Sequence, residues 1–303
     1  VLSLPLVFAC GTKDRVFNPI KPTPDNFTAH ANQVEFADVL RSEGAGDDGL
    51  MNDPALTAVT REFGPSVIPI SQLPHRSEVA IATTIPWSSW WYPKKDDLLF
   101  NDSQNGPAPL SKYDGVHRRR DPSAGSAAQY EKENHNPNAA PWEGLCDAWA
   151  LAAILHQEPK HSVVAKTGDS DEVTFEVGDL KALLFKTYEA LEESGLKYYG
   201  QKFTGDVKGW IYPDMYPDQF HRFLEVQLIQ GKRAFVMDHD PGIQMWNVPV
   251  YKANYVLDKV PDNPNAVFVR AWVYSAEPMQ VHERHFVGTR EVVREYNYVL
   301  QGT

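Results

Sequence analysis

The sequence predicts an α+β fold in which helices come first along the chain and an antiparallel sheet follows. An Ala-rich apolar run follows Cys146, and a second segment has apolar residues at helical spacing. Beyond about residue 200, strand-like runs alternate with turn residues. Hydrophobic residues make up 42% and charged residues 23% of 303 positions, as in folded globular proteins. We expect one large domain, or a core with a smaller lobe.

Two helices are expected in the first part of this pattern. A turn through Gly144 places Cys146 at the N-terminus of a helix that continues to Leu155. Asp179 is expected to cap the second helix, whose apolar face comprises Leu180, Leu183, Leu184, Tyr188 and Leu191. Before them, residues 114–138 are polar and charged and predict a surface loop, with the arginines at 118–120 in solvent.

The later segments predict the sheet. Residues 220–229 and 233–240 flank a turn at Gln230-Gly231-Lys232 and are expected to form a hairpin. Three further strands are expected at 251–257, 266–274 and 291–300. The sequence therefore favours a sheet assembled mainly from the last third of the chain.

The N-terminal region is expected to serve export. Residues 1–10 resemble the apolar part and lipobox of a bacterial lipoprotein signal, with Cys10 as the lipidation candidate. Residues 11–80 mix turn formers with short apolar pieces, which predicts an extension or linker, and 81–303 form the expected catalytic domain. We therefore expect a secreted protein or a cell-envelope lipoprotein with a lipid anchor.

Charge and composition argue against several classes of protein. The net charge of −11 would repel a phosphate backbone, so no nucleic-acid partner is expected. No apolar run is long enough to form a transmembrane segment. His282 and His285 are not an i, i+4 helical pair and have no nearby third ligand, so we expect neither a metal site nor a cofactor.

Cys146 is the first candidate for chemistry. A helix N-terminus lowers the pKa of a thiol and supplies backbone N–H groups for an oxyanion. The alternative is a buried structural cysteine, which is a common fate of this residue. Asp147 adds a carboxylate beside the thiol, and like-charge repulsion would raise the thiol pKa.

A nucleophilic thiol needs a histidine base and a group that orients the imidazole. We expect His221 as the base, at the start of the predicted hairpin, and Asp238 as the acid, at its end. Strand alternation would put Asp238 and Asp240 on one face and His239 on the other. His239 and Asp240 are therefore the alternative base and acid.

A family resemblance joins these observations. PWSSWWYP (86–93), PLSKYD (109–114), WEGLCDAWALAAI (142–154), FEVGDLKALL (175–184), FH (220–221) and MWNVPVY (245–251) follow the order seen in the transglutaminase elicitor family of oomycete cell-wall enzymes and bacterial relatives. This resemblance implies a papain-like thiol enzyme that forms isopeptide bonds between protein Gln and Lys side chains. It also implies Cys146 as nucleophile, His221 as base and Asp238 as acid.

Protein substrates are the partners that this reading implies, with Gln as acyl donor and Lys as amine acceptor. Aromatic walls would exclude water and favour the amine; the candidate substrate-binding residues are Trp87, Trp90, Trp91, Trp142, Trp246 and Asn247. A cysteine peptidase using the same triad is the alternative enzyme. A surface-binding protein that has lost thiol reactivity is the alternative from another class.

Overall fold

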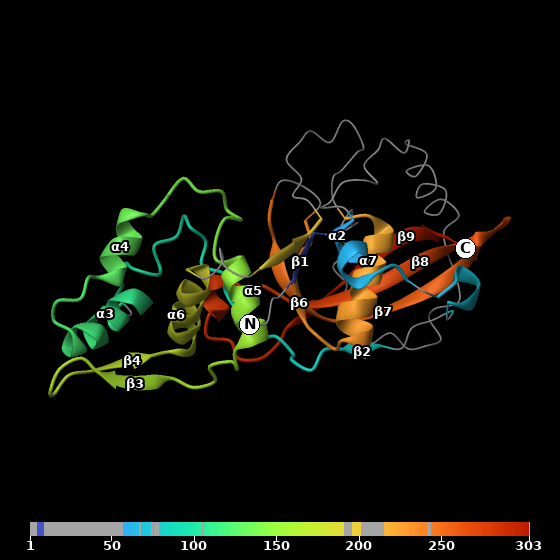
Figure 1. The fold of residues 1–303 in the computed structure, drawn as a ribbon. Coiled ribbons are helices and arrows are strands. Elements are labelled where there is room, and N and C mark those ends of the chain that lie inside the picture. Colours follow the sequence, from blue (N-terminus) through green and yellow to red (C-terminus); the bar gives the residue numbers. More distant parts are fainter. Residues whose placement is uncertain are drawn as a thin grey trace.

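The computed structural model describes residues 5–8, 57–66, 68–73, 75, 79–104, 106–190, 196–200, 215–240 and 244–302. A twisted sheet of long strands forms one part of the molecule, and helices with a small hairpin form the other (Figure 1). Helix α5 lies where the two parts meet. The expected α+β class is confirmed.

The main sheet has the strand order β5-β1-β6-β7-β8-β9, and the short β2 also pairs with β7. Strand β1 runs parallel to β5 and β6, whereas the pairs from β6 to β9 are antiparallel. The strands are β1 (Pro5–Phe8), β2 (Ala80–Ile81), β5 (Lys197–Tyr199), β6 (Phe235–Asp238), β7 (Asn247–Val260), β8 (Asn263–Ala276) and β9 (Glu291–Gln301). The three strands expected at 251–257, 266–274 and 291–300 are confirmed as β7, β8 and β9.

The hairpin expected at 220–240 is wrong in its first half. Residues 217–224 form helix α7 (Pro217–Leu224), which continues through the π-helical turn η5 (Glu225–Gln230). Pro217 suits the first turn of a helix, and the apolar residues of this segment follow a helical period. The buried members of that period are Phe220, Phe223, Leu224 and Leu228. Only the second half of the expected hairpin is a strand, β6.

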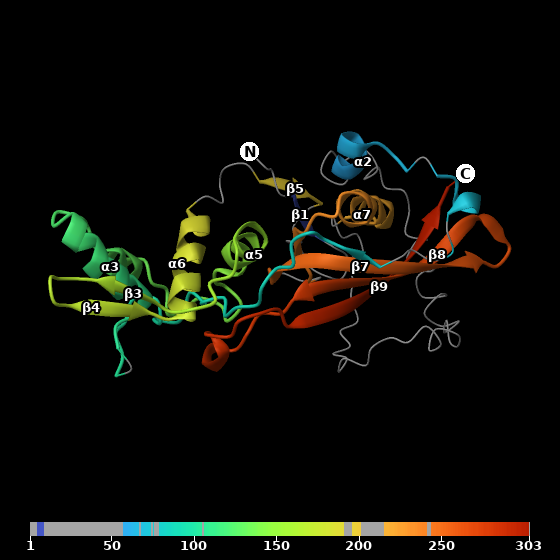
Figure 2. The same ribbon diagram turned by 90° about the horizontal axis from the view of Figure 1, so that it is seen from below.

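Helix α7 covers one face of the sheet (Figures 1 and 2). Phe223 meets Phe235 of β6 edge to face, and Phe220 contacts Tyr296 and Tyr298 of β9. Burying these rings removes large apolar areas from water and fixes the helix on the sheet.

The loop expected at 114–138 is also wrong. Two helices occupy most of it, α3 (Pro109–Arg120) and α4 (Ala127–Glu133). Asp114 is buried because its carboxylate accepts hydrogen bonds from Ser126 Oγ and from the backbone N–H groups of Ala127 and Ala128. That carboxylate therefore ties α3 to the start of α4. The arginines at 118–120 are exposed, as expected.

Helix α5 (Cys146–Leu155) is apolar on nearly all sides and is packed between α6 (Val177–Glu189) and strands β6 and β7. The expected helix at 146–155 is confirmed. The second expected helix is present as α6, but it begins earlier. Glu176 is its N-cap, and Asp179 occupies the third helical position in a capping box. A hairpin of β3 (Val163–Lys166) and β4 (Glu172–Phe175) connects α5 to α6.

A buried lysine joins α6 to three loops. Lys181 is fully buried, and its ammonium lies 2.7 Å from the carboxylate of Glu158. The same ammonium donates to the backbone oxygens of Ser88 and Phe286, at 2.8 and 2.9 Å. Glu158 also accepts from the backbone N–H of Gly288. All three ammonium protons therefore have acceptors, which the burial of this charge requires.

Part of the expected N-terminal extension packs on helix α7. Helix α2 (Ala58–Phe63) meets α7, where Gln219 accepts from the backbone N–H of Thr60 at 2.9 Å. The guanidinium of Arg222 donates to the backbone oxygens of Phe63 and Gly64. Cys10 lies outside the described residues, so its lipidation stays a prediction, as do the expected domain boundaries. Within the described ranges, no helix is long and apolar enough to cross a membrane.

Candidate active site

Cys146 is the first residue of α5. The start of this helix is held in place where the chain at Gly144 and Leu145 packs closely against the segment of Trp91. The backbone N–H of Leu145 donates to the oxygen of Trp91 at 2.8 Å. A Cβ at Gly144 would lie 2.5 Å from an atom of the Trp91 ring and 3.0 Å from Pro93 Cα. Only glycine allows this contact without displacement, so Gly144 lets the chain turn into α5 against the Trp91 segment.

The Cys146 thiol is enclosed by the start of β7. It is 5% exposed, and its Sγ lies 3.6 Å from the backbone oxygen of Met245, to which the thiol donates. The backbone N–H of Asn247 donates to Sγ. Burial, followed by the negative charge of Asp147, raises the Cys146 pKa to about 12. The thiol is therefore protonated at neutral pH in this structure.

These contacts settle two expectations about the thiol. The carboxylate of Asp147 raises the pKa of Cys146, as predicted. The backbone N–H of Asp147, at the start of the helix, lowers the Cys146 pKa, but desolvation of the enclosed thiol outweighs this effect and the net pKa is raised.

Asp238 lies beside this thiol at the end of β6. It is buried, and its Oδ1 accepts hydrogen bonds from the backbone N–H groups of Trp246, at 2.9 Å, and Asp240, at 3.1 Å. Its partner across the β6–β7 register is Asn247. The charge of Asp238 contributes to the raised Cys146 pKa, so the two groups interact electrostatically. The structure therefore brings Cys146, Asp238 and Asn247 together.

His239 follows Asp238 directly. Its backbone N–H donates to the Trp246 oxygen, and its Nε2 accepts from Arg294 at 2.8 Å. Because an arginine only donates, Nε2 carries the lone pair and the proton of the neutral ring is on Nδ1. Nδ1 is buried without a hydrogen-bond partner among the described residues. Burial, and then the charge of Arg294, lowers the His239 pKa to about 3.

His221 lies elsewhere. It belongs to α7 and not to a strand, so no hairpin carries it to the edge that holds Asp238. Its Nδ1 shares a hydrogen bond of 2.8 Å with the hydroxyl of Tyr298, and its ring packs on Tyr255. Nε2 is buried without a hydrogen-bond partner among the described residues, with Glu225 4.0 Å away. Burial lowers the His221 pKa to about 4. The imidazole therefore makes no hydrogen bond with Cys146.

The comparisons with known proteins come from sequence and from structure. Residues 116–272, about half of the chain, match a family model described as "Transglutaminase elicitor". The chain belongs to the transglutaminase elicitor family. The crystal structure of the GP42 transglutaminase from Phytophthora sojae is similar in fold, with a TM-score of 0.51 and 20% identity over 84% of this chain and 83% of that one. No match was found among curated proteins.

The expected aromatic residues of this transglutaminase elicitor family member divide into two groups. Trp87 and Trp90 are buried in the core, where the Trp87 ring stacks on Phe185. Trp91, Trp142 and Trp246 are partly exposed. The rings of Trp91 and Trp246 meet edge to face at 5.2 Å. Because these two residues adjoin the backbone that contacts Leu145 and Cys146, they form the aromatic border of the site.

Two features of this family member were missed from the sequence. Arg294 is the partner of His239 although the two are 55 residues apart, and nothing in the local pattern indicates that contact. Asn247 was expected at the site, but no sequence signal indicated that its buried amide oxygen has no hydrogen-bond partner among the described residues. No group of three or more His, Cys, Asp or Glu among the described residues is arranged to hold a metal ion.

Proposed function

We propose that this chain is a protein-glutamine γ-glutamyltransferase with Cys146 as its nucleophile. Sγ attacks the carboxamide carbon of a glutamine side chain; the C–N bond breaks, a thioester forms, and ammonia leaves with the proton that the Cys146 thiol gives up. The amine of a lysine then attacks the thioester, and the Cys146 thiol is restored with the amine's proton. Membership of the transglutaminase elicitor family, together with a thiol at the start of α5 beside Asp238, supports this proposal.

The developing oxyanion has two donors in this proposal. The first is the backbone N–H of Cys146, which stands at the first position of α5, where a helix offers unpaired donors. The second is the side-chain amide of Asn247. The backbone N–H of Asn247 donates to Sγ, so this residue adjoins the reacting atom. Such donors stabilise the tetrahedral intermediate by fixed dipoles.

In this proposal the alternative candidate His239 serves as the base, because it follows Asp238 directly in the chain; its ring makes no hydrogen bond with Cys146 in the structure. It extends from the end of β6, next to the carboxylate of Asp238 and opposite Trp246. In the structure its lone pair accepts from Arg294, so proton transfer requires that this hydrogen bond be released first. The contacts of His221 are with Tyr298 and Tyr255 instead, and its assignment as base stays a prediction for the assay to decide.

The surroundings of the thiol favour an amine over water as acceptor. Cys146 is enclosed, and the rings of Trp91 and Trp246 border it. A thioester formed there is shielded from bulk water until an acceptor side chain enters. A lysine side chain brings its own apolar stem to this aromatic border.

The test is incorporation of a labelled primary amine into a Gln-containing donor protein, followed by mass spectrometry. The wild-type chain should incorporate amine and release ammonia. Cys146→Ala and His239→Gln should lose this activity, whereas His221→Gln should keep it when folded. Circular dichroism of each variant shows whether it is folded.

Three results would contradict parts of this proposal. If a folded His221→Gln variant loses amine incorporation while His239→Gln keeps it, the base is His221 and not His239. Backbone cleavage without amine incorporation would identify a peptidase. Incorporation by Cys146→Ala would remove the nucleophile assignment.

A further inference from the structure

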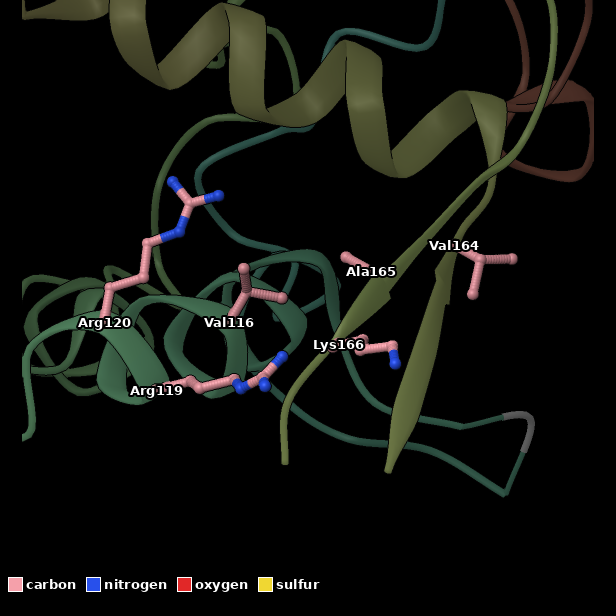
Figure 3. Close-up of a pocket in the computed structure, with 6 residues that line it drawn as sticks. All are labelled: Val116, Arg119, Arg120, Val164, Ala165 and Lys166. Atoms are coloured by element: carbon pink, nitrogen blue, oxygen red, sulfur yellow. The ribbon is translucent and has the colours of Figure 1, made fainter. Parts of the chain in front are cut away.

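A cavity of about 420 Å³ lies far from Cys146, between the end of α3 and the strand β3. Figure 3 shows its lining: Val116, Arg119 and Arg120 from α3 face Val164, Ala165 and Lys166 from β3. The helical part of the molecule that holds it projects away from the main sheet (Figures 1 and 2). A cavity of this volume is large enough to hold several side chains of a ligand.

The cations of this cavity are only partly compensated, since Lys166 stands opposite Glu172 in the β3–β4 register. Arg119 reaches one carboxylate, that of the fully exposed Asp169, at 3.5 Å. Arg120 and Lys166 have no ion pair within the part of the chain that the structure describes. A chain with a net charge of −11 thus holds three cations around one hollow.

The helix dipole explains only part of this cluster. Cations in the last turn of α3 are stabilised by the carbonyl end of that helix. Lys166, however, comes from β3, on the other side of the cavity. Val116 and Ala165 add apolar side chains to this lining, whereas Val164, which alternates with Ala165 along β3, lies farther from the arginines and is 58% exposed (Figure 3). The cavity therefore combines separated positive charges with an apolar lining.

We propose that this cavity binds an acidic peptide segment of a protein partner. The carboxylates of Asp or Glu side chains pair with the planar guanidinium groups of Arg119 and Arg120 and with the Lys166 ammonium. An apolar side chain between the acidic ones covers the apolar lining at Val116 and Ala165. The site is a docking site and not the acyl site, because it lies across α6 from α5 (Figure 1).

The test measures binding of a fluorescein-labelled Asp/Glu-rich peptide by anisotropy. Cys146→Ala serves as the parent chain, so binding is measured without covalent chemistry and does not rest on the proposed function. The double variant Arg119→Gln/Arg120→Gln should weaken binding about tenfold, which corresponds to about 1.4 kcal/mol for two charge pairs. Added Lys166→Gln should weaken it further, and rising salt should weaken the parent's binding.

A matched control separates the cavity from the general charge. Arg118→Gln/Lys132→Gln removes two exposed cations from α3 and α4 that do not line the cavity, and binding should change less than about twofold. Equal weakening in both double variants would contradict the proposal, because it would mean that the peptide responds to the general positive charge of this surface and not to the cavity. Absence of binding by the parent, or displacement of the peptide by a sulfated polysaccharide at lower charge concentration than by unlabelled peptide, would overturn it.

Discussion

Acidification should destabilise the protein through His221, because burial keeps this imidazole neutral in the folded state. The folded pKa is about 4, compared with about 6.5 in the unfolded chain. Between about pH 6.5 and about pH 4 the unfolded chain binds a proton on His221 that the folded protein does not bind. The folded state is therefore fully stable with respect to this group above about pH 6.5, and it loses stability as the pH falls toward about 4. Linkage between these two pKa values gives a loss of about 2.5 kcal/mol at about pH 4.5.

Urea unfolding at about pH 7.5 and about pH 4.5 measures this effect. The difference in unfolding free energy between the two pH values should be smaller by about 2.5 kcal/mol in His221→Gln than in the wild type. His161→Gln, which removes an exposed imidazole, should keep the wild-type difference. An unchanged difference in His221→Gln would refute the argument that His221 is buried and neutral in the folded protein.

Three further predictions follow from the packing and charges. Gly144→Ala should lower the unfolding free energy by about 1–3 kcal/mol and reduce amine incorporation, because the new Cβ would overlap the neighbouring indole. Lys181→Met should cost about 3–5 kcal/mol in urea unfolding, since it leaves Glu158 buried without its cation, whereas the exposed Lys160→Met should cost almost nothing. Asp147→Asn should speed alkylation of Cys146 by iodoacetamide near neutral pH, because removing the adjacent charge lowers the thiol pKa; an unchanged rate would exclude this repulsion.

The sequence predicted the elements that have strong local signals. The Ala-rich run after Cys146 and the alternating strands near the C-terminus are confirmed. The strand expected at 220–229 is wrong because aromatic residues favour strands and a short apolar run fits a strand as well as a buried helix. Its apolar spacing at Phe220, Phe223 and Leu224, and Pro217 before it, were the signals for α7.

The candidate site was harder to predict because its contacts join distant segments. The position of Cys146 at a helix N-terminus followed from local sequence, but its raised pKa depends on enclosure by Met245 and Asn247, a hundred residues away. The contact of His239 with Arg294 depends on how the sheet brings β9 near the end of β6. Neither burial nor these contacts can be read from composition or spacing.

The most direct test of the central claim is the intact mass of the protein after brief incubation with a Gln-containing peptide and no amine acceptor. The account predicts an adduct equal to the peptide less one ammonia, located on Cys146, removed by hydroxylamine and absent from Cys146→Ala. An adduct at another residue would contradict it. So would ammonia release that persists in Cys146→Ala.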